Sequence, residues 1–293
     1  MITGFIGAGR TGCSLGKYLS EAGMPPAGYY DLSEEAAKSA AEFTGSKHFF
    51  HISDLVDACS LIFITTPDGL IGEAWETIKD SLDHNCKIEG KILCHCSGAL
   101  TSDAFSGIKR AHAYGCSLHP MLPFSSRLSS YKLLKQAFFT IEGDPKAVQA
   151  VSELFTDLGN TVCPIEKSCK PKYHAAASIL SNQVTAVIDT GYRLLEECGF
   201  SREDARRATK TLTLSNLDAI IQNDCAQALT GPIERGDIQT VQKHLSCLSP
   251  EDQSMYRILG LKLLRIAQEK NPGKDYKKLQ NLFMGNPSQT ENP

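Results

Sequence analysis

The chain has 293 residues, of which 42% are hydrophobic, and its 30 basic and 33 acidic residues give a net charge of −3. This length fits one large or two moderate domains with sizeable apolar cores. The charge gives no overall attraction to nucleic acid or to an anionic membrane, and the sequence does not interleave basic with aromatic residues as nucleic-acid-binding surfaces do. We therefore expect a small-molecule substrate, and neither nucleic acid nor membrane as a partner.

The sequence contains no stretch of 18 uncharged apolar residues, and Met1 leads into a predicted strand rather than into a signal peptide. We therefore expect a cytoplasmic protein. The cysteines number 11, which is odd, and they fit reduced, buried thiols better than a disulfide framework. Cys94, His95 and Cys96 come closest to a metal cluster, but in a strand the two cysteines face one side and the histidine the other, so no metal is expected.

The first half of the chain alternates short apolar runs with segments of helical periodicity, a pattern typical of βαβ units and a parallel sheet. Ser33 precedes acidic residues and predicts a helix N-terminus. Helices are predicted over 12–22, 33–43 and 70–82. The predicted strands are Ile2–Ile6, Gly28–Tyr30, Ser60–Thr65, Lys91–Cys96, Tyr114–His119 and Ala137–Ile141, and one more helix and a short strand end near Ile165.

From Lys170 onward the sequence changes character. Residues 173–200 contain no proline and a single glycine before Gly199, which predicts one long, mostly apolar helix of about 28 residues. Such a helix is expected to be buried nearly all round, in a bundle or against a partner chain. Further helices are predicted over 201–223, 237–244 and 249–270. We therefore predict an α/β domain with a parallel sheet over 1–165, an all-α domain over 166–270 and a polar, loosely held tail over 271–293.

A glycine-rich turn follows the first predicted strand and opens the first helix. Its sequence is Gly7-Ala8-Gly9-Arg10-Thr11-Gly12, in the placement required of a dinucleotide-binding turn. Gly7 permits the tight turn, Gly9 lets the backbone approach a pyrophosphate, and Gly12 allows the helix to pack closely on the strand. The helix N-terminus adds free N–H groups and a partial positive charge. The alternative is an ordinary glycine-rich bend.

Asp31 stands at the predicted end of the second strand, 19 residues after Gly12. A carboxylate at this place can accept hydrogen bonds from both ribose hydroxyls of an adenosine, and it repels a 2′-phosphate. The predicted cofactor is therefore NAD(P), with NAD favoured by Asp31, although Ser33 leaves NADP open. The alternative is an aspartate that faces solvent.

Two other predicted strands end in polar loops on the ligand side of the sheet. Thr65, Thr66 and Pro67 follow one strand, and Ser97 follows the next. Ligands of parallel α/β sheets bind at the carboxyl ends of the strands, so we expect these residues to contact the cofactor near its nicotinamide ribose. Ordinary capping of the loops is the alternative.

These motifs together resemble the 6-phosphogluconate-dehydrogenase-like two-domain proteins. The similarity is greatest to a branch in which a Rossmann-like domain precedes a domain of unknown function, DUF2520. It extends over residues 1 to about 268 and is carried by FIGAGRTG, TTPD, HCSGAL, SLHPMLPF, FFTIEGD, YHAAASILSN and ALTGPIERGD. The resemblance implies a Rossmann-type sheet, an NAD(P)-dependent oxidoreductase activity and an α-helical domain that commonly forms the dimer, but no particular substrate.

Hydride transfer to or from a carbonyl or imine needs a group that exchanges a proton and groups that position the substrate. His119 ends a predicted strand, with Pro120 fixing the turn, and is expected to contact the substrate. His174, Ser178 and Asn182 recur every four residues along the long helix. His174 is our candidate general acid or base, Asn182 is expected to contact the substrate or the nicotinamide, and Ser178 is a further candidate for the site. Packing against neighbouring helices is the alternative for all three.

The resemblance implies a lysine on this helix, followed four residues later by an asparagine. The corresponding pair is His174 and Ser178, or Ser178 and Asn182, and no lysine stands in either pair. This difference puts a lysine-based mechanism in doubt. His174 and Asn182 are also about 12 Å apart along a helix axis, so one end of the stripe is structural or the ligand is long.

A charged turn at residues 228–237 follows the interruption of the helical pattern at Gly231-Pro232. Arg235 in this turn is predicted to bind a carboxylate or phosphate of the substrate. A solvated turn between helices is the alternative.

Two functions fit these residues. The first is an NAD(P)-dependent oxidoreductase acting on a small polar, anionic carbonyl, hydroxyl or imine compound. The second is a non-catalytic dinucleotide-binding redox sensor or partner-binding subunit. The absent lysine favours the second, whereas the combination of the glycine turn with Asp31, His119, His174 and the charged turn favours the first. In either case the long apolar helix predicts a homodimer formed through the helical domain.

Overall fold

The computed structural model describes residues 1–82 and 87–285. By its internal contacts the chain divides into two compact units, Met1–Gln183 and Val184–Pro293. The division falls later than the boundary expected near residue 165, because the segment after the last strand stays attached to the sheet. Lys170 in that segment is buried, and its ammonium donates a hydrogen bond to the carbonyl of Ser97 (2.8 Å).

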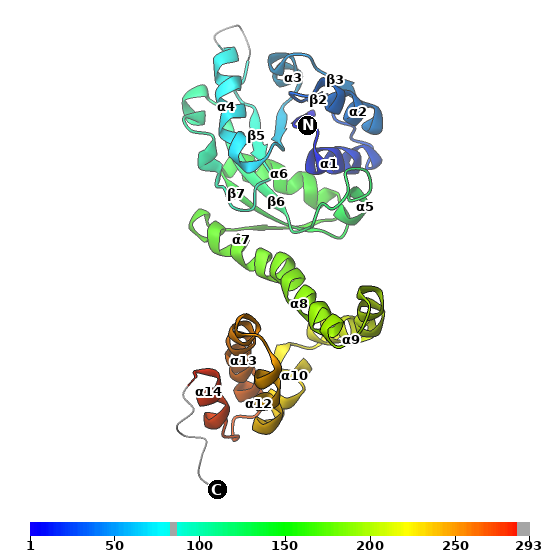
Figure 1. Ribbon diagram of the computed structural model, residues 1–293. Coiled ribbons are helices and arrows are strands. Elements are labelled where there is room, and N and C mark those ends of the chain that lie inside the picture. The colour runs from blue at the N-terminus through cyan, green and yellow to red at the C-terminus, as the bar shows by residue number, and fades with distance from the viewer. Residues whose placement is uncertain (83–86, 286–293) are drawn as a thin grey trace. The chain divides into compact units, whose positions relative to one another are not determined.

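The first unit is built on one eight-stranded sheet (Figure 1) with the strand order β3-β2-β1-β4-β5-β6-β7-β8. All neighbouring strands are parallel except β6 and β7. The fold-class prediction is therefore confirmed, and the two-residue strand β3 was not predicted. The strands are β1 (Thr3–Ile6), β2 (Gly28–Tyr30), β3 (Lys47–His48), β4 (Leu61–Ile64), β5 (Ile92–His95), β6 (Tyr114–Pro120), β7 (Phe138–Gly143) and β8 (Thr161–Pro164).

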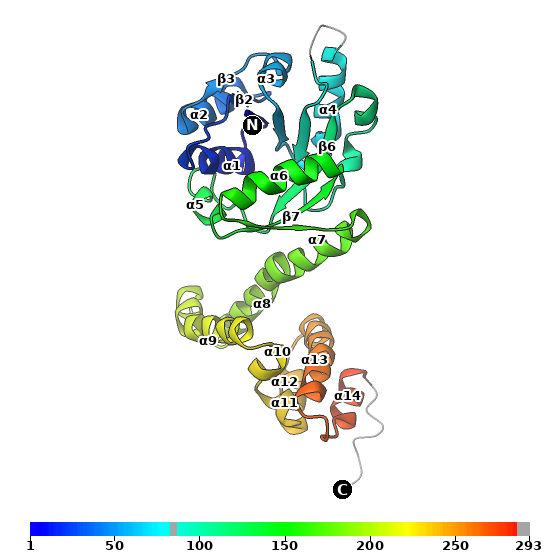
Figure 2. The same cartoon turned by 180° about the vertical axis from the view of Figure 1, so that it is seen from behind.

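Helices cover both faces of the sheet (Figure 2), so its central strands are apolar on both sides. One face packs against α1 (Arg10–Glu21), α2 (Glu34–Thr44), α5 (Tyr131–Leu134) and α6 (Pro145–Asp157), and the other against α3 (Ile52–Ala58) and α4 (Asp68–Leu82). The predicted cap of α2 forms, because the Ser33 hydroxyl accepts a hydrogen bond from the N–H of Ala36 (3.2 Å). On the first face the ring of Phe5 stacks between Tyr29 and Phe63, with both pairs of ring centroids 5.2 Å apart.

The long helix predicted over 173–200 is present over 170–197 and contains a π-helical turn. The structure has α7 (Lys170–Ser178), a π-helical turn (Ile179–Gln183) and α8 (Val184–Glu197). No residue of α8 is buried within the single chain, so the expected burial of this helix nearly all round would require a partner chain. An apolar face of α8 is thus exposed unless another molecule covers it.

The second unit is all-helical, as predicted, and its core lies among its C-terminal helices. Residues 271–285 differ from the predicted polar tail, because Leu279 and Phe283 of α14 (Lys277–Phe283) are 1% and 3% exposed in the core of this unit. Gly260 of α13 allows this packing, since a Cβ there would lie 2.6 Å from the Phe283 ring. The helices after α8 are α9 (Arg202–Gln222), α10 (Cys225–Ala228), α11 (Pro232–Arg235), α12 (Ile238–Cys247), α13 (Pro250–Lys270) and α14 (Lys277–Phe283).

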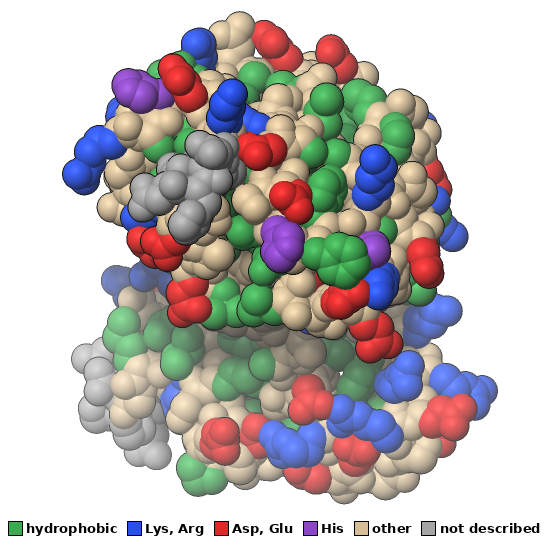
Figure 3. All heavy atoms as spheres, turned by 90° about the horizontal axis from the view of Figure 1, so that it is seen from above, with side chains coloured by type: hydrophobic (Ala, Val, Ile, Leu, Met, Phe, Trp, Pro, Cys, Tyr) green, Lys and Arg blue, Asp and Glu red, His purple; other side chains and the backbone are tan. Residues whose placement is uncertain are grey.

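Three properties bear on the expectations from composition. In the described part of the chain, no helix is both long enough and apolar enough to span a bilayer. The ten cysteines that lie within it are free thiols. Acidic and basic side chains are interspersed on the face shown in Figure 3, rather than gathered in a patch of one sign.

The buried side chain of Asn160 connects α1 with the end of α5 and the residues that follow it, so its removal should lower the stability of the first unit. It is 5% exposed, its amide donates to the carbonyls of Leu134 (2.7 Å) and Ala137 (3.2 Å), and its oxygen accepts from the Tyr18 hydroxyl (2.8 Å). Asn160→Ala leaves these buried partners unpaired, so we expect the free energy of unfolding in urea to fall by about 2–4 kcal/mol.

The matched control is Gln149→Ala, which removes an exposed amide bonded to Glu153 (2.9 Å). This change should alter the free energy of unfolding by less than about 0.5 kcal/mol. Equal stability of the two variants would contradict the role given to Asn160.

Candidate functional site

The glycine turn leaves β1 under tight steric limits. Gly7 has φ +102°, and its N–H donates to the carbonyl of Tyr30 (2.8 Å). A Cβ at Gly7 would lie 2.9 Å from the backbone of the β4 loop, and one at Gly12 would lie 2.3 Å from the Gly7 carbonyl oxygen. By contrast, nothing lies within 4 Å of the Cβ position at Gly9. A side chain at Gly7 or Gly12 would therefore clash with neighbouring backbone, whereas the space beside Gly9 is free.

Asp31 fastens this turn to the end of β2. One carboxylate oxygen accepts from the N–H of Ala8 (2.7 Å), and the other accepts from the N–H of Ser33 (2.9 Å). Asp31 thus fixes the backbone of the glycine turn and of the segment that follows β2. Arg10 and Thr11 begin α1 directly after the turn, and Arg10 is exposed.

A pocket of about 260 Å³ lies at the carboxyl ends of β1, β2 and β4. The predicted residues that line it are Gly7, Gly9, Asp31, Thr65, Thr66 and Pro67. Sequence analysis missed its apolar walls, which include Leu32, Ile52, Leu70 and Ala74, because single apolar residues in loops and helices carry no functional signal.

Two features of this pocket fit a dinucleotide. The hydroxyl oxygen of Thr66 is buried without a hydrogen-bond partner, which is unfavourable unless a ligand or water satisfies it. The open approach to Gly9 leaves room for a phosphate beside the backbone. Thr65 differs from Thr66, since its hydroxyl donates to the Gly7 carbonyl (2.8 Å) and so fastens the turn.

The hydroxyl of Ser97 forms hydrogen bonds that stabilise the loop after β5. It donates to Asp68 at the start of α4 (2.7 Å) and accepts from the N–H groups of Ala99 (3.1 Å) and Leu100 (2.9 Å). The Ser97 side chain thus shapes the turn around Gly98, while a role in contacting the cofactor stays a prediction.

His119 and His174 converge on Gly98. A Cβ at Gly98 would lie 2.4 Å from Nδ1 of His174 and 2.8 Å from Nε2 of His119, and the centroids of the two rings are 5.9 Å apart. Nδ1 of His119 lies 2.6 Å from the hydroxyl oxygen of Tyr173, which sequence analysis missed. Nδ1 of His174 is buried without a hydrogen-bond partner. The structure therefore brings the two predicted histidines together. Pro120, the residue after His119, is the buried last residue of β6.

His119 is neutral at physiological pH. Burial lowers its pKa from the ordinary value to about 4, and the positive charge of Lys170 acts in the same direction, whereas the Asp68 carboxylate opposes it. A neutral imidazole carries one N–H donor and one acceptor nitrogen, so His119 can bridge Tyr173 and a second polar group.

Lys170 is a residue of this region that sequence analysis missed. It is 1% exposed, and its ammonium donates to the carbonyl of Ser97 (2.8 Å) and to the hydroxyl of Ser117, 3.9 Å from the carboxylate of Glu142. Burial lowers the pKa of Lys170, while Glu142 raises it. The statement that neither predicted pair contains a lysine stands, because Lys170 belongs to neither pair. Lys170 precedes His174 by four residues, and that spacing was the missed signal.

The predicted stripe of His174, Ser178 and Asn182 does not persist. Ser178 ends α7, half-buried, and Asn182 lies exposed in the π-helical turn. In a π-helix the hydrogen bonds join residues five apart, so residues four apart no longer share one face. Arg235 is also exposed and ends the short helix α11 in the second unit. In that turn Asp237 caps α12 through the N–H of Thr240 (3.0 Å).

His95 has a structural role, because both of its ring nitrogens form hydrogen bonds within the protein. It is fully buried, Nε2 donates to the carbonyl of Thr101 (3.0 Å), and Nδ1 accepts from the N–H of Ser97 (3.2 Å). Burial lowers its pKa to about 4. Across residues 1–82 and 87–285, no group of three or more His, Cys, Asp or Glu side chains could hold a metal ion.

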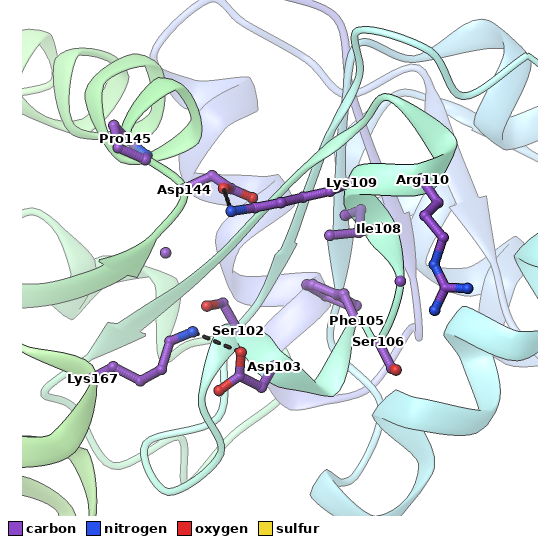
Figure 4. Close-up of a pocket in the computed structure, with 12 residues that line it drawn as sticks. Ser102, Asp103, Phe105, Ser106, Ile108, Lys109, Arg110, Asp144, Pro145 and Lys167 are labelled. Carbon is purple, nitrogen blue, oxygen red and sulfur yellow. Dashed lines mark hydrogen bonds and ion pairs between the residues drawn. The ribbon is translucent and has the colours of Figure 1, made fainter.

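A separate pocket of about 510 Å³ contains none of the predicted site residues (Figure 4). The ammonium of Lys167 lies 2.7 Å from the carboxylate of Asp103, and that of Lys109 lies 3.5 Å from Asp144. Because these charges are paired with each other, we place the candidate site at the glycine turn and Gly98 instead.

Solved structures of similar fold include a protein from Thermotoga maritima, which is 22% identical with a TM-score of 0.70 and covers 92% of this chain and 99% of its own. A candidate NADP oxidoreductase from Bacteroides fragilis is 20% identical with a TM-score of 0.70 and covers 90% and 97%. Pyrroline carboxylate reductase from Plasmodium falciparum, solved with NADP bound, is 15% identical with a TM-score of 0.60 and covers 92% and 96%. At these identities the likeness concerns the fold.

Comparison with curated protein sequences gives no match. Family models do match. Residues 1–120 match the Rossmann-like domain, and residues 137–263 match the domain of unknown function DUF2520. These matches confirm the resemblance found in the sequence motifs. The chain therefore combines a Rossmann-like domain with a domain of the DUF2520 family.

Proposed function

We propose that the protein is an NAD(P)-dependent oxidoreductase acting on a small polar, anionic carbonyl, hydroxyl or imine compound. The observation that carries the proposal is the pocket at the carboxyl ends of β1, β2 and β4, with its open Gly9 and its unpartnered Thr66 hydroxyl. Similar folds in an NADP-bound pyrroline carboxylate reductase and in imine reductases support the reaction class. When bound, the dinucleotide supplies or accepts the hydride.

The glycine turn would hold the pyrophosphate of the dinucleotide, and Asp31 would hold its adenosine ribose. Backbone N–H groups at Gly9 and the start of α1 suit the pyrophosphate. The Asp31 carboxylate, fixed by Ala8 and Ser33, suits the ribose hydroxyls and disfavours a 2′-phosphate. We therefore propose NAD as the preferred form.

Asp31→Asn tests this preference. The wild type should bind NADH at least about tenfold more tightly than NADPH, which requires only about 1.4 kcal/mol of repulsion. The variant should lose most of that preference, because its neutral amide no longer repels the phosphate. Calorimetric titration with both dinucleotides measures the ratio. Tighter binding of NADPH than of NADH by the wild type would overturn the assignment.

His174 and His119 are the proposed substrate-side groups. His174 would exchange a proton with the substrate through its unpartnered Nδ1, and neutral His119 would position the substrate with support from Tyr173. Support is weaker for three other predicted residues. Ser178 is half-buried, and the side chains of Asn182 and Arg235 are exposed to solvent.

The variants His174→Gln and Gly98→Ala test this assignment. His174→Gln removes the proton-exchanging group, and Gly98→Ala places a methyl group where the two imidazoles converge. In each variant we expect turnover to fall by about 100-fold or more, with NADH affinity nearly unchanged. NADH oxidation with a panel of 2-oxo acids, 3-oxo acids, imino acids and short aldehydes measures turnover.

The matched control for that experiment is His51→Gln, which changes an exposed histidine that forms no side-chain cap on α3. Its turnover should equal that of the wild type. Undiminished turnover in His174→Gln would remove His174 from the mechanism. NADH binding by the wild type without turnover of any compound would favour the redox-sensor alternative.

We also propose a homodimer formed through the second unit. Helices α8 and α9 border a groove of about 450 Å³ whose lining includes Val187, Ile188, Leu212 and Leu217, and Leu212 is 71% exposed. An exposed apolar groove of this kind is typical of an association surface. A second copy presenting the same helices would cover it.

Leu212→Glu tests the dimer, because it would place a charge in the covered groove. Sedimentation equilibrium should give a dimer for the wild type and a monomer for this variant. Leu128→Glu, which changes an exposed leucine in the first unit, should leave the dimer intact. A wild-type monomer at micromolar concentration would contradict the proposal.

A further inference from the structure

Arg127 contacts the glycine turn from a distant part of the chain. It lies in the non-helical segment Met121–Ser130, which follows β6. Its Nε donates to the carbonyl of Ala8 (3.0 Å) and to Sγ of Cys13 (3.2 Å). Its terminal nitrogens donate to the hydroxyl of Ser39 (3.1 Å) and to the carbonyl of Ala36 (2.8 Å). One side chain thus joins the turn, α1 and α2.

Arg127 holds the carbonyl of the Ala8–Gly9 peptide, which also accepts a hydrogen bond from Sγ of Cys13 (3.1 Å). The N–H of Ala8, which Asp31 holds, belongs to the preceding Gly7–Ala8 peptide. In a planar trans peptide the carbonyl of one residue and the N–H of the next point in opposite directions. Holding the Ala8 carbonyl toward Arg127 therefore directs the Gly9 N–H away from it. Gly9 lines the candidate dinucleotide pocket and has open space beside it.

We propose that Arg127 is a positioning residue for dinucleotide binding, which holds the Ala8–Gly9 peptide so that the Gly9 N–H faces the pyrophosphate. The inference rests on the proposed function. Because the turn is already ordered, ligand binding does not carry the entropy cost of ordering it, and the affinity is therefore higher.

The side chain at 127 must be arginine for this role. The acceptors lie on three elements, and the planar guanidinium reaches them with nitrogens that point in different directions. A lysine has one ammonium on a flexible stem and cannot hold the Ala8 carbonyl and the α2 acceptors together. Leu122 and Phe124 of the same segment pack against the hydrophobic core to which α1 and α2 also contribute, and this packing helps to hold the segment that carries Arg127.

Calorimetry on the full chain tests the proposal, with NADH, ADP and adenosine as ligands. In Arg127→Gln we expect binding of NADH and of ADP to weaken by about 10- to 100-fold, the loss of one charge-assisted hydrogen bond that orients the turn. Adenosine has no phosphate, so its affinity should stay within about twofold of the wild type. Equal weakening of all three ligands in a folded Arg127→Gln variant would overturn the proposal.

Two further variants separate geometry from charge. Arg127→Lys keeps the positive charge and should still show the phosphate-specific loss, and it also carries the test if Arg127→Gln does not fold. Lys132→Gln removes an exposed charge nearby in sequence and should bind all three ligands like the wild type. Wild-type affinity for ADP in Arg127→Lys would overturn the positioning role while leaving the proposed function intact. A wild type that binds neither NADH nor ADP would instead refute the proposed function, and the role of Arg127 with it.

Discussion

The orientation of the two peptides on either side of Ala8 is the constraint on which the dinucleotide side of the candidate site depends. Gly7 adopts a positive φ directly against the backbone of the β4 loop, so the chain has little freedom as it leaves β1. Asp31 and Arg127 then hold the two polar groups of Ala8. The turn is thus fixed before any ligand arrives, and it determines where α1 begins and which amide groups face the pocket.

A buried charge organises the other side of the candidate site. An ammonium with 1% exposure is unfavourable unless its donors are satisfied, so Lys170 stays buried only in an arrangement that supplies the Ser97 carbonyl, the Ser117 hydroxyl and the nearby Glu142 carboxylate. This requirement attaches the start of α7 to β5 and β6. His174, one turn further along α7, is thereby brought to Gly98.

Much of this arrangement could be predicted because its causes are local. The glycine turn, the Ser33 cap and the alternation of strands and helices each depend on neighbours in sequence. Arg127 gave no such signal, since its partner Ala8 lies 119 residues away. The burial of Phe283 was also unpredictable for this reason, because it depends on packing against the other helices of the second unit. The π-helical turn after Ser178 was not predicted either, and the described part of the chain shows no packing that explains it, since its residues are exposed.

The glycine turn and the pair of histidines at Gly98 are held by separate sets of contacts, although His119 and Arg127 lie close together in the sequence. His119 is the second-last residue of β6, where it pairs in register with Thr140 of β7 and lies against Tyr173, and none of these contacts involves the glycine turn. Arg127 follows in the same chain but makes its contacts with α1, α2 and Ala8. Disturbing the phosphate-facing peptide therefore need not displace the imidazoles, so cofactor affinity and proton exchange are physically separable properties of this fold.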